Sequence, residues 1–181
     1  MKKTRIMDET EINRALARMT HEILEQNRGT ENICLLGVKT RGIPLAARLA
    51  KNIEKFEGVS LPIGRLDITL HRDDLTEEEK KARQAECHFP CDITGKTVII
   101  ADDVLYTGRT VRAAIEAVFA VGRPQSIRLA VLIDRGHREL PIRPDYIGKN
   151  VPTSKNEKIA VYLEECDSEN GVYLCDSPSK N

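Results

Sequence analysis

Three apolar runs, each ended by a polar turn, most constrain what this chain of 181 residues can fold into. The runs span residues 33–38, 97–101 and 126–133, and their continuous apolar character is typical of strands buried on both faces. Strands that alternate with helical patterns favour a mainly parallel sheet flanked by helices. We therefore expect an α/β fold in one domain, residues 1–181, since no internal repeat or interdomain linker is visible.

Other apolar patterns predict most of the remaining elements. The expected helices span residues 8–27, 45–55 and 110–121, and further strands span 59–66, 159–163 and 172–174. Pro62 and Gly64 favour a sheet edge or a bulge for the strand over 59–66, because proline cannot donate a ladder hydrogen bond. We expect residues 135–158 to be irregular and the densely charged residues 71–86 to form a mobile excursion.

The charge balance excludes a bulk polycation. The chain has 28 Lys and Arg residues against 28 Asp and Glu residues, which gives a net charge of zero with histidine neutral. No apolar stretch approaches the ~18 residues of a membrane-spanning helix, and the first residues contain no apolar signal segment. We therefore expect a cytoplasmic protein with no membrane partner.

The five cysteines are an odd number, and in a reducing compartment we expect them to be free thiols. Cys87, His88 and Cys91 leave part of a zinc site as an alternative, although no second ligand pair stands nearby. Only the fold could bring Cys166 and Cys175 to that segment. We expect no metal site made by the protein alone.

The strongest functional signal follows the apolar run 97–101. The acidic pair Asp102-Asp103 comes next, and the turn Thr107-Gly108-Arg109-Thr110 then opens a helix. Adjacent carboxylates can bind the vicinal hydroxyls of a sugar, while threonine hydroxyls and amides at a helix start can hold a phosphate. Gly108 lets the backbone approach closely. The pattern favours a ligand such as a ribose 5-phosphate; the alternative is a solvated acidic turn before an ordinary helix cap.

This run resembles the phosphoribosyl diphosphate (PRPP) motif of type I phosphoribosyltransferases. In that family the acidic pair contacts the ribose hydroxyls and the Thr-Gly-x-Thr turn binds the 5-phosphate. The resemblance implies the type I phosphoribosyltransferase fold, which is a mainly parallel central sheet flanked by helices, with a small hood and a flexible loop.

A second turn, Lys39–Gly42, follows the strand expected over 33–38. Arg41 can donate two charge-assisted hydrogen bonds to diphosphate oxygens, and Gly42 permits a backbone conformation barred to other residues. The resemblance implies that Thr40, Arg41 and Gly42 form the diphosphate loop. It also implies that residues 71–86 close over the substrate, with Arg72 reaching the phosphates; the alternative is a merely solvated charged face.

Longer matching segments, including residues 72–75, 102–112 and 134–143, extend the resemblance to roughly residues 5–165. The chain is similar to the family of bacterial pyrimidine operon attenuation regulators that are also uracil phosphoribosyltransferases. This implies that PRPP and uracil give UMP and diphosphate, with Mg²⁺ carried by PRPP. The alternative is a phosphoribosyltransferase for another nucleobase that has no RNA-binding role.

The resemblance also implies a role for each of a set of residues. The implied catalytic residues are Asp102, Asp103, Arg41 and Arg72. The implied substrate-binding residues are Thr40, Arg41, Gly42, Asp102, Asp103, Thr107, Gly108, Arg109, Thr110, Asp134 and Arg135. Backbone groups just after Asp134 are expected to read the edge of the base.

A local basic surface indicates a second class of ligand. Arg14, Arg18 and His21 share one stripe of the first helix, and residues 135–155 contain five Lys or Arg and two acids. Such a patch can bind RNA phosphates, or it is a solvated face. The resemblance implies binding of pyrimidine operon leader mRNA that depends on UMP or UTP, by a homodimer or higher homo-oligomer. The residues it implies for RNA binding are Arg18, His21, Arg138, Arg143 and Lys149.

Overall fold

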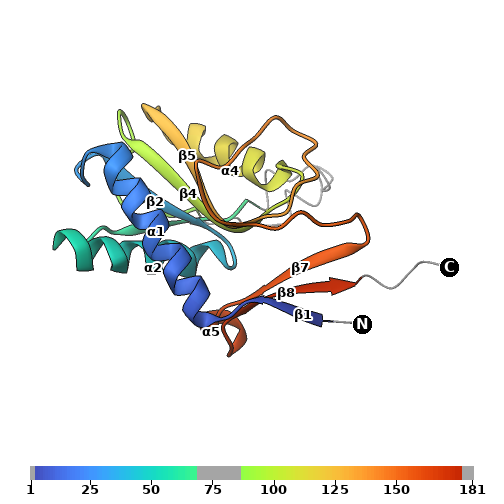
Figure 1. The fold of residues 1–181 in the computed structure, drawn as a ribbon. Helices are drawn as coiled ribbons and strands as arrows, with labels where there is room; N and C mark the ends of the chain where they lie inside the picture. Colours follow the sequence, from blue (N-terminus) through green and yellow to red (C-terminus); the bar gives the residue numbers. More distant parts are fainter. Residues whose placement is uncertain (1–2, 69–86, 177–181) are drawn as a thin grey trace.

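The computed structural model describes residues 3–68 and 87–176, which form two sheets and their helices. The larger sheet has five strands in the order β3-β2-β4-β5-β6, and every neighbouring pair is parallel. Its strands are β2 (Ile33–Val38), β3 (Ile63–Leu66), β4 (Thr97–Leu105), β5 (Ser126–Asp134) and β6 (Tyr146–Asn150). Figure 1 shows this sheet with helices on both sides, as the sequence predicts.

Helices cover the two faces of the parallel sheet because its strands are apolar on both. On one face, α1 (Glu9–Asn27) and α2 (Gly42–Glu57) pack on Leu35, Ile99 and Leu132. On the other face, α4 (Arg109–Phe119) packs on Leu36 and Ile100. Consecutive strand residues thus alternate between two separate cores, as the period of two in a strand requires.

Helix α1 begins where its sequence pattern predicts. Asp8 is the N-cap: its carboxylate accepts a hydrogen bond from the Glu11 backbone N–H at 2.8 Å, and the Glu11 carboxylate accepts from the Asp8 backbone N–H at 2.9 Å. This capping box satisfies two backbone donors that the helix itself leaves unpaired. The apolar stripe of the helix, including Ile12, Leu16 and Met19, is fully buried.

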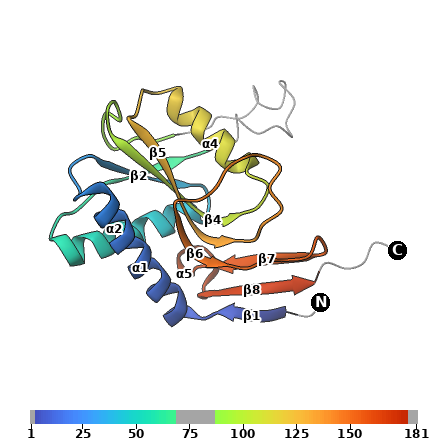
Figure 2. The ribbon, with the colours of Figure 1, turned by 45° about the horizontal axis from the view of Figure 1, so that its top comes forward.

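A second, antiparallel sheet forms the hood. It has the order β1-β8-β7, with β1 (Lys3–Met7), β7 (Glu157–Tyr162) and β8 (Gly171–Asp176), and the short helix α5 (Glu164–Asp167) joins β7 to β8. The predicted final strand pair is therefore confirmed, whereas β1 was not expected. Figure 2 shows β1 beside β8, so the hood joins segments from the two ends of the chain.

Two expectations from the sequence are wrong in detail. Strand β4 does not end at Ala101 but continues to Leu105, because β5 is long enough to pair with Asp102 and Val104. The acidic pair therefore lies in a strand and not in a loop. Residues 135–158 are not wholly irregular, since they contain β6, which pairs with β5.

The strand over 59–66 shortens to β3, which lies at the sheet edge as Pro62 and Gly64 predict. All five cysteines are free, as expected. Arg72 and the loop over 71–86 lie outside the described residues. No helix within residues 3–68 or 87–176 is long and apolar enough to cross a membrane.

Candidate active site

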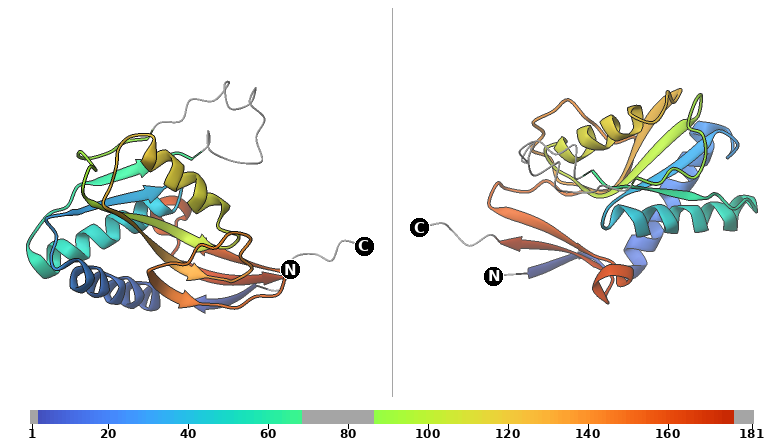
Figure 3. Two further views of the ribbon diagram at one scale, coloured as in Figure 1. Left: turned by 90° about the horizontal axis from the view of Figure 1, so that it is seen from above. Right: turned by 180° about the vertical axis from the view of Figure 1, so that it is seen from behind.

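The acid-pair cavity, of about 390 Å³, lies at the carboxyl ends of β2, β3 and β4. Open parallel sheets bind ligands at this end of their strands. Its lining includes residues from three chain segments that are far apart in sequence: Thr40, Arg41, Asp67, Asp102, Asp103 and Thr110. The views in Figure 3 show that β2, β3 and β4 run side by side, with their carboxyl ends at the same end of the sheet.

The acidic pair is held by its own strand. The Asp103 backbone N–H donates to Asp102 Oδ1 at 2.9 Å, and the Val104 backbone N–H donates to Asp103 Oδ1 at 2.8 Å. Asp102 is only 7% exposed. Burial raises the pKa of both carboxyl groups, and repulsion from Asp103 raises the pKa of Asp102 further. Ionised oxygens in this site therefore need hydroxyl donors or a cation from a ligand.

The turn after β2 brings Thr40 and Arg41 to the acidic pair. Gly42 begins α2, and a Cβ on this residue would lie 2.3 Å from the Ala101 carbonyl oxygen. The glycine is therefore required for the close approach of α2 to β4. Gly42 is not among the residues with positive φ, so the expectation of a special backbone conformation was wrong. The peptide bond between Lys39 and Thr40 is cis.

Arg41 does not point freely into the cavity. Its Nε donates to Asp167 Oδ2 at 2.9 Å, and its Nη2 donates to Asp167 Oδ1 at 2.6 Å. Asp167 belongs to α5 of the hood. The hydrogen bond from Arg41 lowers the pKa of Asp167, so this carboxyl group is ionised at neutral pH. The hood therefore contributes a charged partner to the predicted diphosphate loop.

The turn after β4 leads into α4 through a glycine. Gly108 is the N-cap of α4 with φ +93°, a left-handed conformation that favours glycine. The Arg109 backbone N–H donates to Thr107 Oγ1 at 3.3 Å, while Thr110 lines the acid-pair cavity. The Arg109 guanidinium pairs with Glu139 at 2.7 Å. The first turn of α4 thus faces the space beside the acidic pair.

Asp134 and Arg135 do not line the acid-pair cavity. They line a second cavity of about 600 Å³ at the end of β5, together with Arg138 and Arg143. Arg135 is 7% exposed, and its guanidinium donates to Thr153 Oγ1 and to the Glu157 carbonyl oxygen. Its side chain therefore joins the loop after β5 to the segment that runs from β6 to the start of β7.

Arg138 is tied to several segments at once. Its guanidinium donates to Asp134 Oδ2 at 2.5 Å, to the Tyr106 carbonyl oxygen at 2.8 Å and to the Ile142 carbonyl oxygen at 2.9 Å. The Glu139 and Leu140 backbone N–H groups both donate to the Thr107 carbonyl oxygen. The turn after β4 and the loop after β5 are therefore joined by one network.

The five residues predicted to bind RNA are called the basic surface here: Arg18, His21, Arg138, Arg143 and Lys149. Arg18 and Lys149 line a third cavity, of about 300 Å³, and both this cavity and the second one include Ile147 and Asn150. Four of the five residues therefore surround β6 and its loop.

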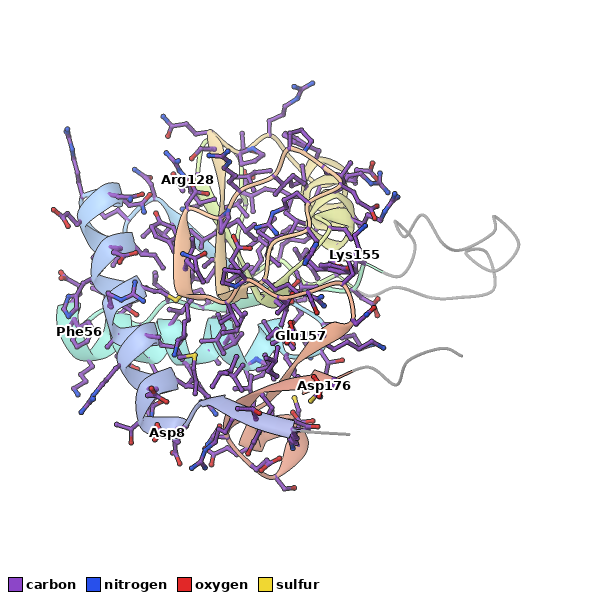
Figure 4. All side chains as sticks on the ribbon, turned by 45° about the vertical axis from the view of Figure 1, so that its right-hand side comes forward. Asp8, Phe56, Arg128, Lys155, Glu157 and Asp176 are labelled. Atoms are coloured by element: carbon purple, nitrogen blue, oxygen red, sulfur yellow. The ribbon has the colours of Figure 1, made fainter. Side chains whose placement is uncertain are left out.

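The side chains of the basic surface differ in how much they are engaged. Arg18 donates to the Gly148 carbonyl oxygen at 2.6 Å, and Lys149 Nζ donates to the Ile6 carbonyl oxygen at 3.0 Å. His21 stacks on Phe56 of α2, with ring centroids 4.3 Å apart. Figure 4 labels Phe56 on α2, close to α1. His21 therefore sits toward α2, whereas Arg18 faces β6.

One charged lining residue, Asp67, was missed at the level of sequence. Asp67 directly follows β3, and Lys39 Nζ donates to Asp67 Oδ2 at 3.0 Å. The signal was available, because the strand over 59–66 was predicted and Asp67 is the first acidic residue after it. Asp67 lies outside the three polar turns that follow residues 33–38, 97–101 and 126–133.

No group of three or more His, Cys, Asp or Glu side chains in the described ranges is placed to hold a metal ion. The lining carboxylates of Asp67, Asp102 and Asp103 are nevertheless oxygen donors, the type that Mg²⁺ prefers. The residues present therefore fit a metal ion that arrives with a phosphorylated substrate.

Comparison with known proteins identifies the class first. The model of the phosphoribosyl transferase domain matches residues 3–165. The chain is therefore a phosphoribosyltransferase, as the apolar strand, the acidic pair and the turn Thr107–Thr110, called the phosphate turn below, predict.

Similar curated proteins then identify the particular family. The bifunctional protein PyrR of Thermoanaerobacter sp. (strain X514) is 56% identical over 172 residues, which cover 95% of this chain and 97% of the relative. The bifunctional protein PyrR of Thermus aquaticus is 56% identical, with 95% of each chain covered. That of Listeria monocytogenes serotype 4b (strain CLIP80459) is 57% identical, with 96% of each covered. The chain belongs to the PyrR family.

Solved structures that are distant in sequence share the fold. A hypoxanthine-guanine phosphoribosyltransferase from Bacillus anthracis has a TM-score of 0.71 at 18% identity and covers 95% of this chain and 98% of its own. A hypoxanthine phosphoribosyltransferase of Trypanosoma cruzi has a TM-score of 0.72 at 18% identity, with 97% of each chain covered. At this identity the likeness concerns the fold alone, and the expected type I phosphoribosyltransferase fold is confirmed.

Proposed function

We propose how the two activities of a bifunctional PyrR protein are divided over this chain, within a single domain of residues 1–181. The protein is an RNA-binding regulator of pyrimidine operon transcription attenuation that also transfers phosphoribosyl from PRPP to uracil, giving UMP and diphosphate. The acid-pair cavity performs the transfer, and the basic surface binds the leader mRNA. The protein works in the cytoplasm.

The ribose 5-phosphate end of PRPP is held by β4 and the turn after it. Buried Asp102 and half-buried Asp103 accept hydrogen bonds from the ribose hydroxyls, which supply donors in place of water. The 5-phosphate lies against the Thr107–Thr110 turn, where the start of α4 offers backbone N–H groups and a favourable dipole. Gly108 and Arg109 belong to that turn.

The diphosphate end lies against Thr40, Arg41 and Gly42. As the bond between C1 and the diphosphate oxygen stretches, positive charge develops on the ribose ring and negative charge gathers on the departing diphosphate. Arg41 offsets the charge on the diphosphate, and the acidic pair offsets the charge on the ring. Mg²⁺ carried by PRPP adds to the neutralisation of the diphosphate. Arg72, which lies outside the residues that the structure describes, is a further candidate to offset the charge on the diphosphate.

Uracil is read by the backbone after Asp134. Gly136 and His137 both have positive φ, at +80° and +61°, and the Gly136 backbone N–H donates to Asp134 Oδ1 at 3.0 Å. Two consecutive left-handed residues turn the backbone sharply, which supports a loop whose polar groups face a ligand. Arg135 holds this loop to Glu157.

The observation that carries the catalytic assignment is the meeting of Arg41, Thr110 and the acidic pair around one cavity. The test is to mix purified protein with PRPP, Mg²⁺ and either uracil, hypoxanthine or orotate, and to measure nucleotide and diphosphate formation. We expect a product with uracil. A preference for hypoxanthine or orotate contradicts the assignment of the base.

The exposure and position of the basic surface support its assignment to RNA binding. Arg143 and Lys149 are exposed on the loop before β6 and on β6 itself, and this loop is bonded to the phosphate turn through Thr107. Hydrogen bonds to Thr107 therefore connect the turn that holds the phosphate of UMP or UTP with the loop that contacts the RNA. The test is a titration of labelled leader hairpin RNA with and without UMP; we expect tighter binding with UMP, and equal binding contradicts the coupling.

Assembly completes the proposal. A homodimer or higher homo-oligomer places two basic surfaces on one particle, which raises the effective concentration of the second contact. The molar mass of the protein in solution, measured by light scattering, tests this directly: a monomer at all concentrations contradicts it.

A further inference from the structure

Two bidentate ion pairs connect the hood to α2. Arg41 precedes the helix and pairs with Asp167, while Arg48 lies two helical turns later and pairs with Glu165. The Arg48 distances are 2.8 Å from Nε to Oε1 and 2.7 Å from Nη2 to Oε2. Both acids belong to α5, which lies where the hood meets the rest of the molecule (Figure 1). The two pairs therefore offer the same chemistry at neighbouring positions.

The two pairs differ in what the arginine faces. Arg41 lines the acid-pair cavity, whereas Arg48 lines a groove between α1, α2 and α5. The Asp167 side chain is 14% exposed and also accepts a hydrogen bond from the Leu163 backbone N–H at 3.0 Å. The Glu165 side chain is 40% exposed. Asp167 is thus the more firmly fixed of the two acids.

The fork between Arg41 and Asp167 uses one edge of the guanidinium. Nε and Nη2 donate to the carboxylate, and no acceptor within residues 3–68 or 87–176 takes a hydrogen bond from Nη1. A guanidinium is planar, so fixing one edge fixes the direction of its remaining donors. The Arg41 side chain is 34% exposed, which leaves these donors accessible to a ligand in the cavity.

We propose that Asp167 is a positioning residue for PRPP, which orients Arg41 so that its free donors meet the diphosphate. The inference rests on the proposed function, because it takes Arg41 as a ligand of the diphosphate. Asp167 acts through Arg41 and does not touch the substrate. The hood, through Asp167 of α5, therefore sets the direction of the Arg41 side chain in the diphosphate loop.

The test compares Asp167→Asn with its matched control Glu165→Gln, which weakens the other fork without touching the cavity. We expect Asp167→Asn to raise the KM for PRPP and the inhibition constant of diphosphate by about 10-fold, with a smaller change in kcat and in the KM for uracil. Glu165→Gln should leave all four values within about 2-fold. Asp167→Glu restores the carboxylate and should recover most of the loss.

Further measurements separate the possible failures. If Arg41→Ala leaves the KM for PRPP and diphosphate inhibition unchanged, the proposed role of Arg41 is wrong. If Arg41→Ala raises both but Asp167→Asn matches Glu165→Gln, only the positioning role is wrong. A tighter binding of PRPP by Asp167→Asn also overturns it, since Asp167 would then compete with the substrate. Thermal unfolding of each variant shows whether Asp167→Asn is folded. If it is not, a folded Asp167→Glu that raises the KM for PRPP as much as Arg41→Ala does overturns the positioning role.

Discussion

In the acid-pair cavity the Asp102 side chain is almost fully buried and its pKa is raised, whereas on the basic surface the Arg18 side chain is 52% exposed. The cavity places charged groups where water cannot reach them easily, so a ligand must compensate them. Arg18, Arg143 and Lys149 of the basic surface keep their charges in water, where salt screens them. The first arrangement suits precise binding of a small substrate, and the second suits attraction of a polyanion.

The same contrast explains what the sequence predicts well. The acidic pair and the phosphate turn occupy nine consecutive residues, from Asp102 to Thr110, so a strand and the start of a helix fix their geometry locally. The basic surface is assembled from α1, a long loop and β6, so no single segment defines it. Helical spacing and a basic segment indicate such a surface, but the resemblance to a family is what assigns its individual residues.

The largest expected effect separates the two regions. Asp103→Asn removes an acceptor for the ribose and a negative charge near the developing cation, so we expect kcat/KM for PRPP to fall by roughly 10²–10³-fold. RNA affinity without nucleotide should stay unchanged, because Asp103 is not part of the basic surface. Asp92→Asn, in an exposed turn, is the control. Equal loss of RNA binding contradicts the separation.

A smaller effect concerns the residue that joins the regions. Arg138→Ala removes hydrogen bonds to Asp134, Tyr106 and Ile142, so we expect it to lower the free energy of unfolding by about 3 kcal/mol. Catalysis and RNA binding should both weaken. Chemical denaturation and the two assays measure this. If only RNA affinity falls while stability is unchanged, Arg138 is a direct RNA contact and its network is secondary.

A third effect isolates the basic surface. Arg143→Ala removes an exposed charge, so we expect RNA affinity to fall about 10-fold, with a shallower dependence on salt and unchanged phosphoribosyl transfer. Arg123→Ala, another exposed arginine in the turn before β5, is the matched control. Binding titrations at several salt concentrations provide the measurement. An unchanged affinity removes Arg143 from the proposed surface.

The smallest effect is on the stability of the ligand-free protein. Burial raises the pKa of Asp103 in the folded state, so its contribution to stability is present at low pH and is lost as pH rises through that pKa. Asp103→Asn removes this loss and should stabilise the protein by about 1 kcal/mol at neutral pH. The gain should shrink as pH falls toward the ordinary carboxyl range. A gain that is independent of pH contradicts the burial argument.

The elements that sequence could not predict depend on distant partners. Strand β1 is short and polar, and it exists because it pairs with β8, at the other end of the chain. Strand β6 spans five residues, and Gly148 allows it to approach the Leu132 carbonyl oxygen on β5. Helix α1, β2 and β5 were predicted closely because each carries its own periodic pattern. The fork between Arg41 and Asp167 joins residues 126 positions apart, which no local motif records.

A crystal structure of the protein with UMP bound tests the central claim most directly. The account predicts the phosphate against the backbone of Thr107–Thr110 and the ribose hydroxyls within hydrogen-bonding distance of Asp102 and Asp103. A nucleotide bound only in the second cavity, beside Arg138 and Arg143, contradicts it.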